Sequence, residues 1–112
     1  TPLQALVLLN DPQYLSASQA LAQRMIEKGG DNSKDRITYA FRWATSRKPA
    51  IDEISILENL LQKEEAEFEA FPERAKSFVD SKNAQGMNTL ESASYTEVAN
   101  AIINLSESLQ KN

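Results

Sequence analysis

Five side chains in this sequence have the types and spacing needed to hold a ligand. Tyr39 and Trp43 are four residues apart, so both would lie on one face of a helix as an aromatic platform. Arg42 and Arg47 flank the end of the same segment, and Tyr95 lies in the last apolar-periodic segment. Guanidinium groups bind carboxylates through paired hydrogen bonds. A pocket that combines these groups would bind a small molecule or a glycan.

The same side chains also have a structural interpretation, which the pattern favours. An aromatic pair at helical spacing packs more often in a core or at its edge than on a ligand. The two arginines could bind backbone carbonyls, or a carboxylate such as Glu53 or Glu58, and so clamp the end of the helix. If the aromatic and arginine side chains are packed and paired, no ligand pocket exists.

Composition argues against an enzyme. The sequence has no cysteine and no histidine, so thiolate nucleophiles, covalent haem attachment, zinc fingers and the commonest general base are excluded. There is no glycine-rich phosphate loop, because Gly29-Gly30 is typical of a helix stop. We therefore expect a non-catalytic protein with no cofactor and no bound metal.

Two acidic segments could bind a cation, but both have a simpler explanation. The oxygens of Asp31 to Asp35 alternate like the start of a calcium loop, yet Arg36 and Arg42 occupy the glycine and glutamate positions. Helix capping is the favoured interpretation. The run Glu64, Glu65, Glu67 and Glu69 is expected to be a solvated helix end, because neighbouring helical carboxylates point in different directions.

The net charge of −4 is unevenly distributed. Residues 1–50 contain seven Lys or Arg and four Asp or Glu, whereas residues 51–112 contain five and twelve. An acidic chain is a poor nucleic-acid ligand, since phosphate contacts need a basic face. The longest apolar run is Ala5 to Leu9, far shorter than the ~20 residues that cross a bilayer, so we expect no membrane insertion.

Apolar spacing predicts an all-α fold. The opening segment, residues 1–9, is apolar nearly all round and would lie inside a bundle. The other expected helices are residues 12–28, a helix between the cap at 31–35 and the break at 46–49, a helix from about 51 into the acidic run, a short helix from 71, and residues 89–109. Two capping boxes compete for the last start, Asn88 with Glu91 and Ser94 with Glu97, and we prefer the earlier.

The side chains expected to face the core follow from the same spacing. They are Tyr14, Ala17, Leu21, Met25, Ile37, Ala40, Phe41, Ala44, Ile54, Leu57, Leu61, Phe68, Phe71, Ala75, Phe78, Val79, Tyr95, Val98, Ala99, Ile102 and Leu109.

Several segments also resemble a known family. The opening Thr1-Pro2-Leu3-Gln4-Ala5-Leu6-Val7-Leu8-Leu9-Asn10-Asp11-Pro12 is similar to the start of the C-terminal part of the planctomycete-specific domain, a bacterial domain of unknown function. Later matches keep the family order: Ala20 to Arg24, Arg36-Ile37, Ala40 to Ala44, Arg47 and Pro49 before Glu53, and Ile102 to Leu109. The last segment departs from the family, with Ser106 and Ser108 in place of its acidic and glutamate-phenylalanine positions.

The resemblance implies a setting. Members of the family are large exported proteins in which this region ends the chain, often after a planctomycete-type cytochrome c domain. We therefore expect residues 1–112 to form a single helical domain at the C-terminal end of a longer exported protein, periplasmic or on the cell surface. Its partners would be the rest of the parent chain or another envelope protein.

These observations lead to one expected architecture and two functions. The architecture is a compact all-α bundle of five to six helices around the apolar N-terminal helix. The first function is a non-catalytic scaffold or protein-interaction module of a multidomain envelope protein. The alternative is a small-molecule or glycan-binding subdomain of a polysaccharide-processing or cytochrome-c-linked enzyme, with Tyr39, Arg42, Trp43, Arg47 and Tyr95 as the contact residues.

Overall fold

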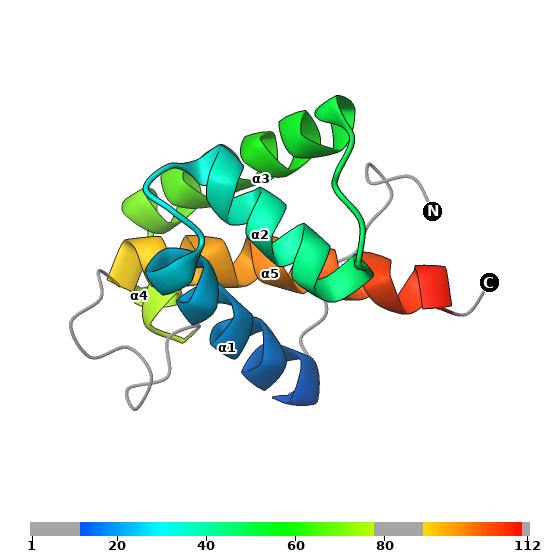
Figure 1. The fold of residues 1–112 in the computed structure, drawn as a ribbon. Helices are drawn as coiled ribbons and strands as arrows, with labels where there is room; N and C mark the ends of the chain where they lie inside the picture. Colours follow the sequence, from blue (N-terminus) through cyan, green and yellow to red (C-terminus); the bar gives the residue numbers. More distant parts are fainter. Residues whose placement is uncertain (1–11, 78–88, 111–112) are drawn as a thin grey trace.

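The helix α5, Thr89–Gln110, lies at the centre of the fold (Figure 1). The structure, a computed structural model, describes residues 12–77 and 89–110, and the side chains of residues 15–77 and 89–106. Within this part of the chain, α5 packs against each of the other four helices. Every residue from Ser92 to Ile102 is buried. A helix that is buried on all sides is the core element of a bundle.

Four helices surround α5. They are α1 (Pro12–Lys28), α2 (Ser33–Thr45), α3 (Ile51–Ala70) and the short α4 (Pro72–Lys76). In Figure 1, α1 and α2 cross in front of α5, while α4 lies beside the N-terminal end of α5. The described residues thus form a helical bundle, which confirms the all-α prediction.

Local sequence determines where α1 ends and α2 begins. Gly29 donates its N–H to the Met25 carbonyl at 3.0 Å, and Gly30 follows with φ of 113°, a conformation that residues with a Cβ rarely adopt. The side-chain oxygen of Asn32 then accepts a hydrogen bond from the Asp35 N–H at 2.9 Å. This is an N-cap, so the capping interpretation of the 31–35 segment is confirmed.

The core combines apolar faces from α1, α2, α3 and α5. Its largest fully buried apolar side chains are Phe41, Phe68, Leu21, Met25, Ile37, Leu57, Ile102 and Val98, all from the expected set. Tyr14, Phe78, Val79 and Leu109 lie outside the described side chains, as does the whole expected helix at residues 1–9. The expected place of residues 1–9 at the centre of the bundle therefore stays a prediction.

Two residues of the expected core are exposed. Ala17 faces outward, because α1 packs through Ser18, Leu21 and Met25, a stripe that begins one residue later. Phe71 is 58% exposed, because it lies in the bend between α3 and α4, and only Ala75 of α4 is buried. The prediction that Ala17 and Phe71 face the core is wrong.

The acidic end of α3 is less solvated than expected. Glu64 is only 7% exposed, because it continues the buried stripe of Leu57 and Leu61 towards Phe68. The solvated-end prediction is therefore wrong for Glu64, whereas Glu69 is exposed as expected. The apolar spacing of α3 skips one position, and a carboxylate occupies it.

Candidate functional site

The outward side of α2 carries three of the five candidate residues. Because Ile37, Ala40 and Phe41 face the core, helical geometry places Tyr39, Arg42 and Trp43 on the flank of α2. Tyr39 is partly buried and packs against the main core cluster, as the core-edge interpretation expects. The tertiary structure thus keeps these three side chains together on one surface.

Trp43 is exposed, in contrast to its expected place in or beside the core. Its side chain is 59% accessible to solvent, so the packing interpretation is wrong for this residue. The cause is its position, because residues 40, 41 and 44 already present the inward stripe of α2 and Trp43 falls outside that stripe. An exposed indole is a large apolar surface left in water.

Trp43 borders a hollow between α1, α2 and α5 that we call the Trp43 groove. The groove has a volume of about 370 Å³. Small side chains line it from two helices, Ala17 and Ala20 from α1 and Ala44 from α2, with Leu21 and Ile103 as larger apolar walls. At one end, the Ser106 hydroxyl donates to the Ala44 carbonyl at 2.8 Å and joins α5 to α2. The groove is therefore mainly apolar.

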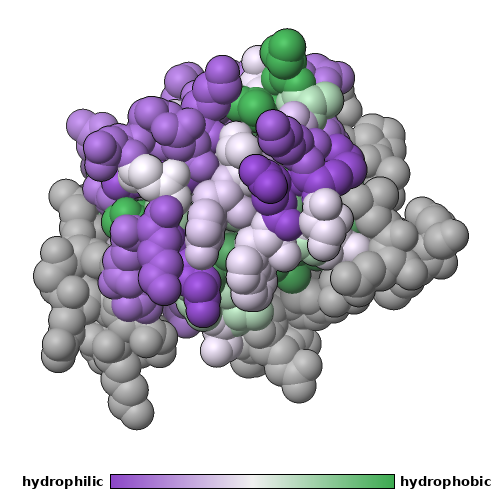
Figure 2. Space-filling model, in the orientation of Figure 1, coloured by the Kyte–Doolittle hydropathy of each residue, from purple (hydrophilic) through white to green (hydrophobic). Residues whose placement is uncertain are grey.

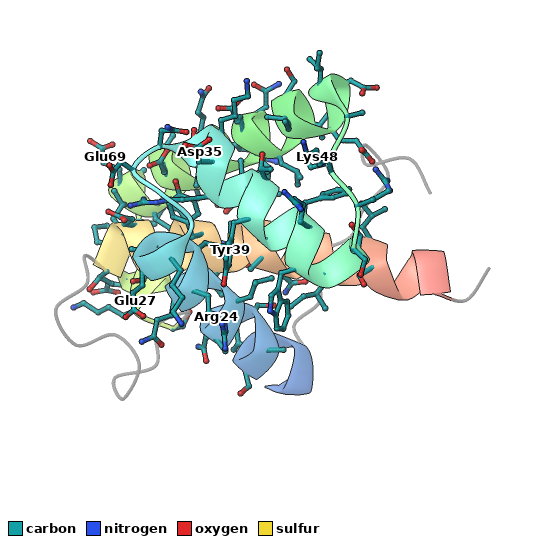
Figure 3. The ribbon with its side chains drawn as sticks, viewed as in Figure 1. Arg24, Glu27, Asp35, Tyr39, Lys48 and Glu69 are labelled. Atoms are coloured by element: carbon teal, nitrogen blue, oxygen red, sulfur yellow. The ribbon has the colours of Figure 1, made fainter. Side chains whose placement is uncertain are left out.

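Arg24 of α1 lies across the exposed ring of Trp43. Its guanidinium carbon is 5.7 Å from the centroid of the Trp43 ring, within the range of a cation–π contact. Figure 3 shows Arg24 on α1 and Tyr39 on α2 on the same side of the molecule. No sequence pattern pointed to Arg24, because its contact depends on how α1 crosses α2.

A second, shallower hollow lies along α2 itself, and we call it the α2 hollow. It has a volume of about 470 Å³ and is lined by Asp35, Thr38, Tyr39, Arg42 and Trp43. Two of its polar groups are already engaged, since Thr38 donates its hydroxyl to the Lys34 carbonyl at 2.8 Å and Asp35 accepts from the Asn32 amide at 3.1 Å. Arg42 is the charged group that remains available.

Arg47 is part of a clamp and lies outside both hollows. Its two terminal nitrogens donate to the two carboxylate oxygens of Glu53, each at 2.9 Å, and one also donates to the Lys48 carbonyl at 3.2 Å. The hydrogen bonds from Arg47 hold the pKa of Glu53 below its usual value. Its guanidinium also lies 4.8 Å from the centroid of the Phe41 ring. This is the structural role that the sequence allowed for Arg47.

Tyr95 is also separate from the other candidates. It is 4% exposed on α5, and the guanidinium carbon of Arg36 lies 5.3 Å from its ring centroid. Arg36 in turn donates to Glu91 at 3.1 Å. Burial raises the pKa of the Tyr95 hydroxyl, and Arg36 partly opposes that rise. Tyr95 is packed and paired, so the geometry unites only Tyr39, Arg42 and Trp43.

Carboxylates gather where α3, α4 and α5 meet, and we call this the acidic corner. Glu97 of α5 is 7% exposed and faces Glu64 and Glu67 of α3 and Arg74 of α4. Burial raises the pKa of Glu97 to about 7, and the negative charge of Glu64 adds to the rise. Arg74 and Glu67 form an ion pair. Among the described residues, no cluster of acidic side chains has an arrangement that could hold a metal ion.

The sequence had offered Ser94 with Glu97 as a possible start of the last helix. Instead α5 begins at Thr89, and both residues are buried in its interior, where the Ser94 hydroxyl has no hydrogen-bond partner. A start at Ser94 is therefore wrong, and Asn88, the cap of the earlier start, lies outside the described residues. The sequence did not predict Glu97 as a buried acid, because its spacing from Ser94 is that of a capping box, in which the glutamate would be at the start of a helix.

Comparison with known proteins identifies one family. The family model described as PSD1, protein of unknown function (DUF1553), matches residues 1–61, just over half of the 112-residue chain. This confirms the resemblance to a bacterial domain of unknown function over that part. No curated protein and no solved structure matches the chain. None of the helices described is long and apolar enough to span a membrane.

Proposed function

The chain belongs to the PSD1 family of proteins of unknown function, and we propose that it is a non-catalytic helical module that docks onto another protein. The observation that carries this proposal is the exposed ring of Trp43 beside the apolar Trp43 groove. Tryptophan and arginine are enriched among the residues that dominate binding energy in protein interfaces. Burying such a ring against a partner removes its apolar surface from water.

The hydrophilic character of the surrounding surface supports a localised docking site. Figure 2 shows a face on which hydrophilic residues predominate, with paler residues of intermediate hydropathy and a few hydrophobic groups between them. Trp43, Ile51 and Phe71 are the exposed large apolar side chains in the described part of the chain, and Trp43 alone among them borders the groove. An apolar hollow rimmed by polar residues is the usual form of an interaction site.

The absence of cysteine and histidine supports a non-catalytic role. The chain has no cysteine or histidine to act as nucleophile or base. Arg36 and Arg47, which could bind an anionic substrate, are held by Glu91 and Glu53. The buried acid Glu97 lies at the acidic corner, which is distinct from the Trp43 groove.

The setting that we propose is the bacterial envelope. It is supported by the resemblance of the opening residues to a region that ends large exported proteins. In this proposal the module is periplasmic or on the cell surface, and its partner is the rest of the parent chain or another envelope protein.

Calorimetric titration of this chain against the remainder of its parent protein tests the proposal. We expect binding that is weakened by Trp43→Ala and by Ala20→Phe, which fills the groove from the exposed side of α1. Ile51→Ala is the matched control, because Ile51 is 86% exposed but lies outside the groove. Equal binding by wild type, Trp43→Ala and Ala20→Phe would refute docking at this surface.

A glycan-binding role is the second candidate, and the α2 hollow is the observation that favours it. Aromatic side chains and a free guanidinium meet there, as in many sites that bind small polar ligands. Since Trp43 is the single tryptophan of the chain, its fluorescence reports directly on this surface. Saturable fluorescence changes with oligosaccharides, and none with protein partners, would replace the docking proposal with this one.

A further inference from the structure

The arginines of the chain divide into two groups by their partners. Arg36, Arg47 and Arg74 each form an ion pair with a glutamate. Arg24 and Arg42 have no ion pair among the described residues, and each lines a hollow that Trp43 also borders. The two arginines left without a carboxylate therefore both belong to the surface that the exposed indole borders.

No acidic side chain of this surface neutralises the two arginines. Asp35 is the one acidic residue in the linings of the two hollows; it lines the α2 hollow and is hydrogen-bonded to Asn32 at the start of α2. Arg42 is seven residues further along α2, which corresponds to about 10 Å of helix rise. Glu27, three residues after Arg24 on α1, accepts a hydrogen bond from Gln23 at 3.1 Å and lines neither hollow. The linings of the two hollows thus hold two arginines and one aspartate, although the whole chain carries −4.

The groove between α1 and α5 supplies the complementary apolar part. Its alanines leave room for an incoming side chain, and the Ser106 hydroxyl is already bonded to a backbone carbonyl. An apolar group that enters this space displaces water from Ala17, Ala20 and Ile103 without leaving a new polar group unpaired. Aliphatic side chains fit such a lining better than a sugar or a phosphate does.

From this arrangement we infer that the partner is an acidic protein segment, which inserts an aliphatic side chain into the Trp43 groove and places a neighbouring carboxylate against Arg24 and Arg42. This inference rests on the proposed docking function and adds the chemistry of the partner. A carboxylate matches the forked donors of a guanidinium, and an aliphatic side chain matches the alanine-lined space. Arg24 can turn from the Trp43 ring to the incoming carboxylate, because its side chain is exposed.

Three synthetic peptides test the partner's chemistry. Each is a short blocked amphipathic helix with a leucine stripe, and the positions flanking the stripe are glutamate in the first, glutamine in the second and lysine in the third. Binding is followed by the fluorescence of Trp43. We expect the glutamate peptide to bind about fivefold more tightly than the glutamine peptide, as for an exposed ion pair, and to lose this advantage at high salt.

Variants of the protein locate the charge effect. Arg24→Gln and Arg42→Gln should each weaken binding of the glutamate peptide by about fivefold and leave the glutamine peptide unaffected. Lys48→Gln removes the same charge from the loop between α2 and α3, away from Arg24 in Figure 3, and should have no such effect. Circular dichroism confirms that each variant keeps its helical content.

The outcomes separate this inference from the proposed function. If all three peptides bind equally, or if Arg24→Gln and Arg42→Gln bind the glutamate peptide as wild type does, the acidic-partner inference is overturned. The proposed docking function would still be supported if Trp43→Ala weakens binding to the remainder of the parent protein. If neither the peptides nor the parent remainder bind at Trp43, both are overturned. Preference for the lysine peptide would also contradict the inference.

Discussion

Replacing Glu97 by glutamine should stabilise the protein at alkaline pH and have little effect at acidic pH. Glu97 is almost fully buried on α5 and faces Glu64, Glu67 and Arg74 at the acidic corner. Its charged form is disfavoured first by burial and then by the negative charge of Glu64. Glutamine keeps the length and shape of the side chain but carries no charge.

The magnitude follows from the pKa of Glu97. It rises from 4.5 to about 7, a difference of about 2.5, and each pKa unit corresponds to about 1.36 kcal/mol. The folded state holds the proton more tightly than the unfolded state. Stability is therefore lost as the pH rises from about 4.5 to about 7, and the full cost of about 3 kcal/mol is present above that range. The glutamine variant does not incur this cost.

Urea unfolding of the wild type and of Glu97→Gln at about pH 4.5 and about pH 8 measures this difference in stability. Far-ultraviolet circular dichroism follows the loss of helix. We expect equal free energies of unfolding at the acidic pH and a gain of about 3 kcal/mol for Glu97→Gln at the alkaline pH. Glu69→Gln is the matched control, because Glu69 is exposed at the end of α3 and should change little at either pH. A gain that is the same at both pH values, or a loss at the alkaline pH, would refute the reasoning.

Variants at three local features of α2 and α3 provide further tests, each by urea unfolding. Arg47→Ala should lower the free energy of unfolding by about 1 kcal/mol at neutral pH, because it removes an exposed bidentate ion pair. Glu53→Gln should remove the same ion pair, so the losses of the two single variants should not add in the double variant; additive losses would contradict the pairing. The Arg47 contribution should fade as the pH falls through the lowered pKa of Glu53. Ser46→Gly should raise the free energy of unfolding by about 0.5 kcal/mol, because Ser46 ends α2 with φ of 64°, a left-handed conformation that glycine adopts without strain. A lower free energy of unfolding would contradict this reasoning. Asn32→Ala should lower the free energy of unfolding by about 1 kcal/mol, whereas Asn32→Ser, which keeps a capping oxygen and adds no charge beside Asp35, should lower it much less; equal losses would refute the capping role.

Local patterns were enough to determine the helices of the described residues. The cap at Asn32, the glycines after Lys28 and the proline before Ile51 act over a few residues, so their effects can be inferred from neighbouring positions alone. The same holds for the Arg47–Glu53 clamp, whose members are six residues apart. Helical spacing likewise identified most of the buried apolar side chains, including Phe41 and Ile102.

Some errors arose where one residue on a helix competed with another for the core. Spacing placed Ala17 in the inward stripe of α1 and Trp43 beside that of α2. One residue corresponds to about 100° around a helix, and both side chains lie outside the covered face. Glu64 and Glu97 are the reverse case, because neighbouring helices cover them despite their charge. Which side of a helix is covered depends on the positions of the other helices.

The sequence by itself therefore determined the helices of the described residues, the family and the absence of thiol and imidazole chemistry, since these depend on residue type and on short-range spacing. Tertiary structure alone decided that α5 is buried on all sides, that Arg24 lies against Trp43, and that Glu97 meets the carboxylates of α3. Each of these contacts joins residues that are distant in the chain, and the packing of helices, which no local pattern specifies, brings them together.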